Sequence, residues 1–247
     1  MSFTNDAESK LLLSKAKDTV NLSDKRSTAC FLGFLNEHES QLIKDGIHLN
    51  DECMFWGGYN GAQRVIFGAN VSEISCFPIT AIKFTFKKEY ELSHRDFLGA
   101  LMSLGIERDT VGDILVFEGE AVVFVKTEIA QFIIGQIDKI GRVGVKQAKF
   151  DTHDFEFENE FDVLNFTISS LRIDVFVSAV CSLSREKSQR LIFTDAVSVN
   201  HRIINNTSKT IDVGDVITIK KFGKFVFTEN NGFSKKGKVK IEVKHFR

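Results

Sequence analysis

Basic side chains gather in one short part of this chain, where they could bind an anionic ligand. Guanidinium and ammonium groups donate hydrogen bonds to phosphate oxygens, and one guanidinium can bind two oxygens at once. A single arginine would be interpreted as a solvated surface charge. Here five basic residues recur within a short span, namely Arg172, Arg185, Lys187, Arg190 and Arg202. Together they favour a phosphate-binding site.

Two short helices are expected to position these residues. Ser169 or Ser170 can cap the first helix, with Arg172 and Asp174 in its opening turn. Ser184 can cap a second helix over residues 184–194. The free amides at the start of that second helix suit phosphate groups on structured RNA.

The second helix would carry polar residues on both sides of a buried stripe. At about 100° per residue, the stripe holds Ser188, Leu191 and Ile192. A short strand after the helix would bring further polar groups close to the basic residues. The expected RNA-contacting residues are Arg172, Ser184, Arg185, Lys187, Gln189, Arg190, Thr194, Asn200, His201, Arg202, Lys220, Lys221 and Lys224.

The net charge of the chain hides a strong division. The formal charge is −1 over 247 residues, yet residues 170–247 hold 15 Lys and Arg against 7 Asp and Glu. Residues 1–169 hold 17 basic and 26 acidic residues. This division predicts a basic, phosphate-facing end joined to an acidic body, which supports a nucleic-acid ligand.

The composition is that of a globular protein, with 43% hydrophobic and 26% charged residues. No stretch approaches the roughly 18 apolar residues that span a bilayer, and the polar, acidic start is unlike a secretory signal. The four cysteines are widely spaced and never form a C-x-x-C pair: Cys30, Cys53, Cys76 and Cys181. We therefore expect a cytoplasmic protein with reduced thiols and neither a metal nor another cofactor.

Residues 1–74 are predicted to form a mostly helical N-terminal domain. Ser27 and Thr28 offer a cap before an amphipathic run over residues 29–37, which favours a helix there. The glycine-rich stretch over residues 55–61 could cradle a phosphate, but no lysine follows it. A tight turn is favoured instead, with Trp56 and Tyr59 packing beside it.

Residues 75–150 show the order β-α-β-β-α-β. The predicted elements are strands over 79–86, 113–117, 121–126 and 142–148, and helices over 94–104 and 128–137. This order is typical of the ferredoxin-like arrangement that RRM modules also use. An RRM needs outward-facing aromatic residues on its central strands, whereas Phe84, Phe86 and Phe124 are expected in the core.

The domain boundary is placed in residues 151–168, which hold six acidic residues and no Lys or Arg. The alternation over 153–158 allows an edge strand, and the rest is expected to be an acidic connector. Residues 169–247 then form the basic C-terminal domain. The predicted fold class is therefore α+β and multidomain.

Residues 171–219 resemble the S4 RNA-binding domain. The motifs are Arg172-Ile173-Asp174, Ser184-Arg185, Leu191-Ile192, 197–200 and Val213-Gly214-Asp215, in the order and spacing of that family. Two positions depart from the family pattern. Asp195 stands where a glycine usually follows the second helix, and His201 follows Asn200 where a glycine or aromatic residue is common.

The resemblance extends upstream to the YlmH-type family of S4 proteins. His94-Arg95-Asp96-Phe97-Leu98-Gly99, Leu104-Gly105-Ile106, Gly112-Asp113-Ile114, residues 55–59 and residues 235–238 resemble that family. It implies a helical N-terminal region, an RRM-like centre and a C-terminal S4 domain. It also implies a monomer on the large ribosomal subunit, with rRNA, peptidyl-tRNA and quality-control proteins as partners and no membrane partner.

Three alternatives remain open from the sequence. His94-Arg95-Asp96 could be catalytic, but the absence of a nucleophile motif nearby favours a structural role or a secondary RNA contact through His94 and Arg95. The chain could be an RNA-modifying enzyme, such as a pseudouridine synthase, that docks through its S4 domain. The acidic N-terminal half could instead be a protein-docking platform. We expect a non-enzymatic RNA-binding protein.

Overall fold

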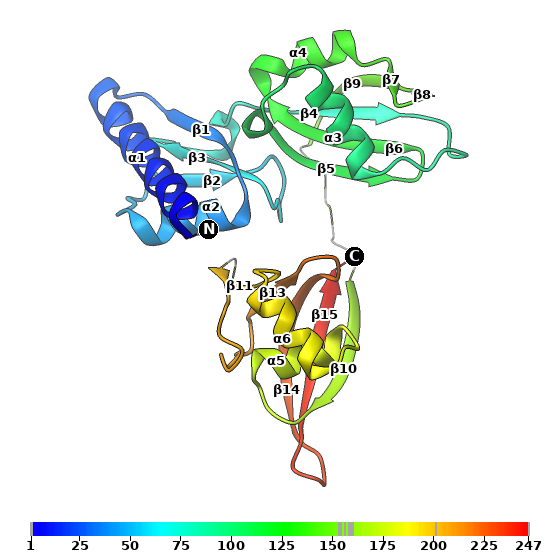
Figure 1. Ribbon diagram of the computed structural model, residues 1–247. Helices are drawn as coiled ribbons and strands as arrows, with labels where there is room; N and C mark the ends of the chain where they lie inside the picture. The colour runs from blue at the N-terminus through cyan, green and yellow to red at the C-terminus, as the bar shows by residue number, and fades with distance from the viewer. Residues whose placement is uncertain (1, 153–154, 156, 158–160, 201, 247) are drawn as a thin grey trace. The chain divides into compact units, whose positions relative to one another are not determined.

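The computed structural model describes residues 2–152, 155, 157, 161–200 and 202–246. The chain divides into two compact units, Met1–Phe157 and Glu158–Arg247 (Figure 1). Among the described residues, no helix is both long and apolar enough to cross a membrane. Both units combine helices with antiparallel sheets, so the predicted α+β multidomain class is confirmed.

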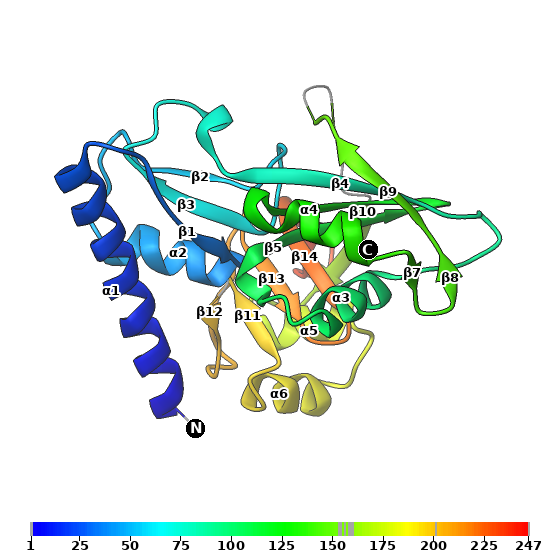
Figure 2. The ribbon, with the colours of Figure 1, turned by 90° about the horizontal axis from the view of Figure 1, so that it is seen from above.

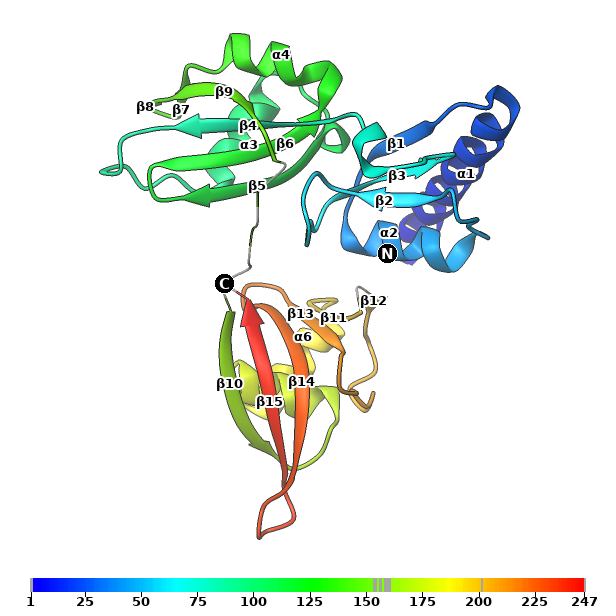
Figure 3. The ribbon, with the colours of Figure 1, turned by 180° about the vertical axis from the view of Figure 1, so that it is seen from behind.

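The first unit begins with two helices on a three-stranded antiparallel sheet of order β1-β3-β2. Its elements are α1 (Ser2–Arg26), β1 (Cys30–Leu35), α2 (Glu37–Gly46), β2 (Met54–Trp56) and β3 (Val65–Ala69). Both helices cover the same face of the sheet (Figures 2 and 3), where Ala16 and Ile43 pack against Phe67.

The helix predicted after Ser27 and Thr28 is wrong, because residues 30–35 form strand β1. Phe34 packs on one face of this strand and Leu35 on the other, and both are buried. A strand that is buried on both faces has a continuous apolar sequence, which periodicity cannot distinguish from a helix. The second helix starts later, where Asn36 and Glu39 form a capping box.

The rest of the first unit has the predicted β-α-β-β-α-β order, in a sheet of order β5-β6-β4-β9. Its elements are η1 (Ile74–Cys76), β4 (Ile79–Thr85), α3 (His94–Ser103), η2 (Arg108–Thr110), β5 (Val111–Phe117), β6 (Glu120–Lys126), α4 (Thr127–Gln136), β7 (Lys139–Ile140), β8 (Val143–Gly144) and β9 (Lys146–Phe150). The predicted last strand over 142–148 is displaced, because residues 139–144 form the small hairpin β7–β8.

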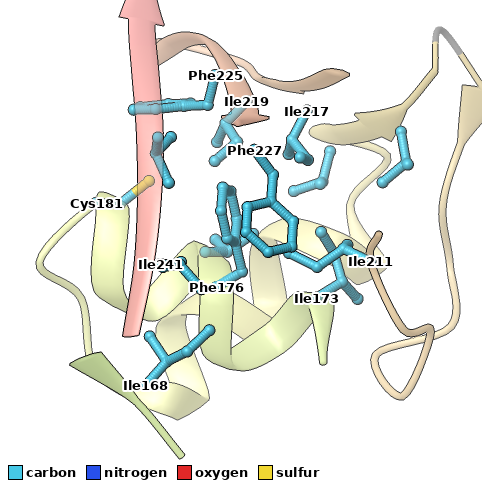
Figure 4. Packing of buried hydrophobic residues seen from close by; sticks show 14 of the residues in the cluster. Ile168, Ile173, Phe176, Cys181, Ile211, Ile217, Ile219, Phe225, Phe227 and Ile241 are labelled. Carbon is cyan, nitrogen blue, oxygen red and sulfur yellow. The ribbon is translucent and has the colours of Figure 1, made fainter. Parts of the chain in front are cut away.

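The second unit is a six-stranded antiparallel sheet of order β10-β15-β14-β13-β11-β12 with two helices on one face. Its elements are β10 (Phe161–Ile168), α5 (Ile173–Val180), α6 (Arg185–Phe193), β11 (Val197–Val199), β12 (Arg202–Ile203), β13 (Val216–Ile219), β14 (Gly223–Phe233) and β15 (Val239–Phe246). Phe176 of α5 and the β14 residues Phe225 and Phe227 belong to its core, where Phe176 lies beside Phe227 (Figure 4).

Two local predictions in this unit need correction. The acidic connector does not extend to residue 168, because residues 161–168 form β10 and pair with β15 along their whole length. The edge strand predicted over 153–158 falls largely outside the described residues. The first helix is not capped by Ser169 or Ser170, since its N-cap residue is Arg172. The predicted cap of the second helix at Ser184 is confirmed.

Candidate nucleic-acid interface

A single buried carboxylate organises the basic residues between α5 and α6. Asp174, in the first turn of α5, has no solvent exposure. Its Oδ1 accepts from Arg172 Nε at 3.0 Å, and its Oδ2 accepts from Arg172 Nη2 and Arg185 Nε, each at 3.1 Å. Oδ2 also accepts from Gln189 Nε2 at 3.1 Å. One aspartate therefore joins three of the residues that the sequence predicts to contact RNA.

The Asp174 carboxylate is ionised over the whole physiological range. Burial raises the pKa of this carboxyl, but hydrogen bonds from Arg172, Gln189 and Arg185 outweigh burial and lower the pKa to about 2. The same contact raises the pKa of Arg172. The buried negative charge thus holds two positive groups in fixed places, which lowers the entropy that they lose when they bind a ligand.

The two anchored arginines keep part of their side chains in solvent. The exposed fraction of the side chain is 58% for Arg185 and 36% for Arg172. Each uses its Nε on Asp174, and no hydrogen bond from the terminal nitrogens of Arg185 is found among the described residues. Arginine carries five N–H donors, so donors remain for phosphate oxygens.

One serine caps the start of α6, and a second serine joins α6 to α5. Ser184 Oγ accepts from Lys187 N at 3.4 Å, which is a helix cap. Ser188 is fully buried, and its hydroxyl lies 2.9 Å from Asp174 O and 2.8 Å from Arg185 O. The predicted stripe of Ser188 and Ile192 is therefore buried, with Leu191 half-buried. Lys187 and Arg190 remain exposed, and no ion pair involves either within the described part of the chain.

Several residues that were predicted to contact RNA form side-chain hydrogen bonds within the protein. Thr194 Oγ1 donates to Arg190 O at 3.0 Å, at the end of α6. Asn200 has a left-handed backbone with φ 48°. Its amide donates to Asp215 Oδ1 at 2.7 Å and accepts from Val216 N at 2.9 Å, so it holds the turn after β11. Asp195 adopts φ 54°, the conformation that a glycine would favour there.

The remaining predicted residues are Arg202, His201, Lys220, Lys221 and Lys224. Lys221 lies in the turn between β13 and β14 and has a left-handed backbone with φ 73°. Arg202 is exposed on β12, whereas His201 lies outside the described residues. Lys220 follows β13, and its amide donates to Ala196 O just beyond α6. Lys224 lies 5.8 Å from the Phe246 ring centroid. It alternates with buried Phe225 on β14 and therefore lies on the sheet face opposite the helices. The structure does not bring Lys224 together with the basic residues of α6.

His94 and Arg95 begin α3 in the first unit. Asp96 accepts from Ser93 N and from Ser93 Oγ, at 2.8 and 2.6 Å, and these bonds lower its pKa. No ion pair between Arg95 and Asp96 is found among the described residues. Burial and the charge of Arg108 lower the pKa of His94, which favours the neutral form of this side chain.

The sheet face that an RRM would use to stack bases is covered in this protein. Phe124, on central strand β6, is fully buried under Tyr59, whose ring stacks on it at 4.8 Å and 28°. Phe155 and Phe157 contact the Tyr59 ring edge-on, each at 5.9 Å. The prediction that Phe84 and Phe124 belong to the core is confirmed, although they lie on opposite faces of the sheet.

Tyr59 is held in place by a second buried carboxylate. Its hydroxyl donates to Asp113 Oδ2 at 2.8 Å, and the amides of Gln63 and Arg64 donate to the same carboxylate at 2.7 and 3.1 Å. Burial and the charge of Asp113 raise the pKa of Tyr59. The tight turn predicted over residues 55–61 is confirmed from residue 57 onward, with positive φ at Gly58 and Gly61, whereas Phe55 and Trp56 belong to strand β2.

The sequence did not reveal that Asp174 is the centre of the site. A signal for it exists, because Asp174 is the one charged residue in the apolar helix Ile173–Val180. A carboxylate in such a helix must be paired if it is buried. The identity of its partners needs the packing of α6 against α5.

Two short helices on an antiparallel sheet, with anchored arginines beside a helix start, define an RNA-binding domain of the S4 class. The S4 domain model matches residues 171–217. The model described as "Putative RNA-binding domain in YlmH" matches residues 73–154, which include the whole four-stranded sheet.

The comparison with whole proteins is consistent with both matches. The chain is 31% identical over 193 residues to the "Ribosome-associated protein quality control protein P2" of Bacillus subtilis, over 76% of this chain and 75% of that protein. The chain belongs to this family of YlmH-type S4 proteins. It is also similar to a solved structure, cell division protein ylmH from Streptococcus pneumoniae. That match is 24% identical, covers 60% of this chain and 93% of the other, and has a TM-score of 0.49.

Proposed function

We propose that this protein binds structured rRNA or tRNA on the large ribosomal subunit, as a non-enzymatic factor in the quality control of obstructed subunits. The observation that carries the proposal is the pair of guanidinium groups that Asp174 fixes beside the start of α6. Arg172 and Arg185 are already ordered, so phosphate can bind at a small entropic cost. Lys187 and Arg190 add charge on the same helix.

Two further observations support this proposal. The basic excess of residues 170–247 is local to the unit that carries α6, while the other unit is acidic. The relative from Bacillus subtilis is named as a ribosome-associated quality-control protein. We further propose that its partners are rRNA, peptidyl-tRNA and other quality-control proteins, and that it acts in the cytoplasm as a monomer.

Co-sedimentation of the full chain with purified large ribosomal subunits tests the RNA site. The variant Arg185→Ala with Arg190→Ala removes one anchored and one exposed guanidinium. We expect weaker binding and a log–log salt slope smaller by about two, because each lost phosphate contact removes about one counterion. Lys15→Ala with Lys17→Ala is the matched control, because both lysines are exposed on α1 of the acidic unit. Unchanged binding by the arginine variant would refute the site.

A second comparison addresses the quality-control role. Binding is measured to vacant large subunits and to large subunits that carry peptidyl-tRNA. The proposal requires tighter binding to the obstructed particles, and a loss of that preference in the arginine variant. Equal binding to both particles would leave an RNA-binding protein and remove the proposed role in quality control.

A further inference from the structure

The hairpin formed by β14 and β15 ends in a turn that projects from the body of the second unit (Figures 1 and 3). Gly237 N donates to Ser234 O at 2.9 Å, and Ser234 N donates to Lys238 O at 2.7 Å. Lys238 N also donates to Ser234 Oγ at 3.1 Å. These bonds close a defined turn with Lys235 and Lys236 at its centre, and Gly237 supplies the left-handed conformation that follows.

An aromatic ring lies in solvent directly before this turn. Phe233 is 72% exposed, the largest exposed fraction among the large hydrophobic residues of the described part of the chain. No ring contact involves Phe233 among the described residues. Exposing an aromatic side chain forfeits the stabilisation that its burial would give, so core packing does not explain this residue.

The surroundings of Phe233 are strongly basic. Residues 230–241 hold four lysines and no acidic residue, and the lysines are Lys235, Lys236, Lys238 and Lys240. All four are exposed, and no ion pair involves them within the part of the chain that the structure describes. Like charges on one small turn repel each other until an anionic ligand neutralises them.

We propose that this turn is a second RNA contact, in which Phe233 stacks on an unpaired nucleobase while Lys235, Lys236 and Lys238 contact the neighbouring phosphates. The inference rests on the proposed RNA-binding function and adds a separate group of contacts, because Phe233 and the three lysines belong to the hairpin and not to α5 or α6. An exposed ring with cations around it matches the chemistry of an unstacked nucleotide. A lone ring gives little affinity for a lipid surface, which favours RNA.

The test uses the full chain with two RNA duplexes, one fully paired and one that carries a single bulged 2-aminopurine. We expect Phe233→Ala to weaken binding of the bulged RNA about tenfold, because base stacking on an aromatic ring contributes this much. The fully paired RNA should bind unchanged. The wild-type chain should change the 2-aminopurine fluorescence and Phe233→Ala should not, whereas Phe233→Trp should restore the change. Phe132→Ala is the control, since Phe132 is 49% exposed on α4 of the other unit.

The lysines are tested with Lys235→Ala, Lys236→Ala and Lys238→Ala together. We expect the log–log salt slope for the bulged RNA to fall by about two to three. Lys15, Lys17 and Lys25, which are exposed on α1, provide a triple alanine control with the same change in charge. A slope unchanged by the hairpin variant but reduced by the control would overturn the proposal.

Two outcomes separate this inference from the proposed function. If Phe233→Ala binds both RNAs as the wild type does, while Arg185→Ala with Arg190→Ala loses binding, the hairpin contact is wrong and the α6 site stands. If neither variant changes RNA binding, the proposed function fails together with the inference. Binding of phosphatidylglycerol vesicles that is lost in Phe233→Ala, without an effect on RNA, would assign the turn to a membrane surface and overturn the RNA contact.

Discussion

Each unit of the protein contains a buried carboxylate that accepts several hydrogen bonds, and the two differ in what they hold. Asp174 accepts from the side chains of Arg172, Arg185 and Gln189, which reach solvent on their other side. Asp113 accepts from the Tyr59 hydroxyl and from the backbone of Gln63 and Arg64, all inside the first unit.

The electrostatics of the two carboxylates follow from this difference. Charged donors outweigh burial at Asp174 and lower its pKa to about 2. At Asp113, burial raises the pKa more than the hydrogen bonds from the Tyr59 hydroxyl and two backbone amides lower it, so the pKa is raised. The first arrangement orders positive charge for a ligand, whereas the second closes Tyr59 over a sheet face. The same residue type thus orders exposed positive charge in one unit and covers a sheet face in the other.

The largest expected effect concerns Asp113, whose carboxylate holds Tyr59 over the sheet face of the first unit. Asp113→Ala leaves the Tyr59 hydroxyl and two amides without an acceptor, and we expect it to lower the free energy of unfolding by about 4 kcal/mol. Urea unfolding followed by fluorescence measures it, because Trp56 is the one tryptophan and lies in the first unit. Asp138→Ala, at an exposed position of that unit, is the control and should change little. A midpoint equal in both variants would contradict the role of Asp113.

A smaller effect on stability is expected in the second unit when the pH is lowered. The folded-state pKa of Asp174 lies below the ordinary value of 3.8, so its contribution to stability is present above that pH and is lost as the pH falls toward 2. We expect the second unit to lose about 2 kcal/mol over this interval. Amide hydrogen exchange in α5 and α6, corrected for the intrinsic rates, measures the loss.

The raised pKa of Asp113 predicts the opposite behaviour for the first unit. A carboxyl with a raised folded-state pKa stabilises the fold at low pH and loses that contribution as the pH rises through its pKa. Asp113 therefore causes no loss of stability on acidification. The variant Asp174→Asn should show a flatter acid profile in α5 and α6. An equally steep profile in that variant would assign the acid effect to other groups.

The smallest expected effect tests whether RNA affinity depends on the ordering of Arg172 and Arg185 or on the total charge of the protein. Asp174→Asn raises the net charge by one but removes the anion that orders Arg172 and Arg185, and we expect RNA affinity to fall about tenfold. Binding to large ribosomal subunits at fixed salt measures this change. Asp212→Asn makes the same charge change at an exposed loop position, so it should bind at least as tightly as the wild type. Tighter binding by Asp174→Asn would show that total charge decides affinity.

Local sequence patterns were sufficient to predict much of the structure of the second unit. The cap at Ser184, the buried face with Ser188 and Ile192, and the order of the S4 motifs all follow from neighbours along the chain. Helix caps and 3.6-residue periodicity act over one or two turns, so a sequence displays them directly. The same reasoning failed at residues 30–35, where a strand covered on both faces has no diagnostic period.

The sequence by itself determined the motif order, the division of charge and most of the helices and strands. Only the tertiary structure decided which charges are ordered and which surface is closed. Gln189 reaches Asp174 across 15 positions, and Tyr59 reaches Asp113 across 54. Such contacts depend on how helices and sheets pack, because a hydrogen bond is fixed by distance and angle and not by spacing along the chain.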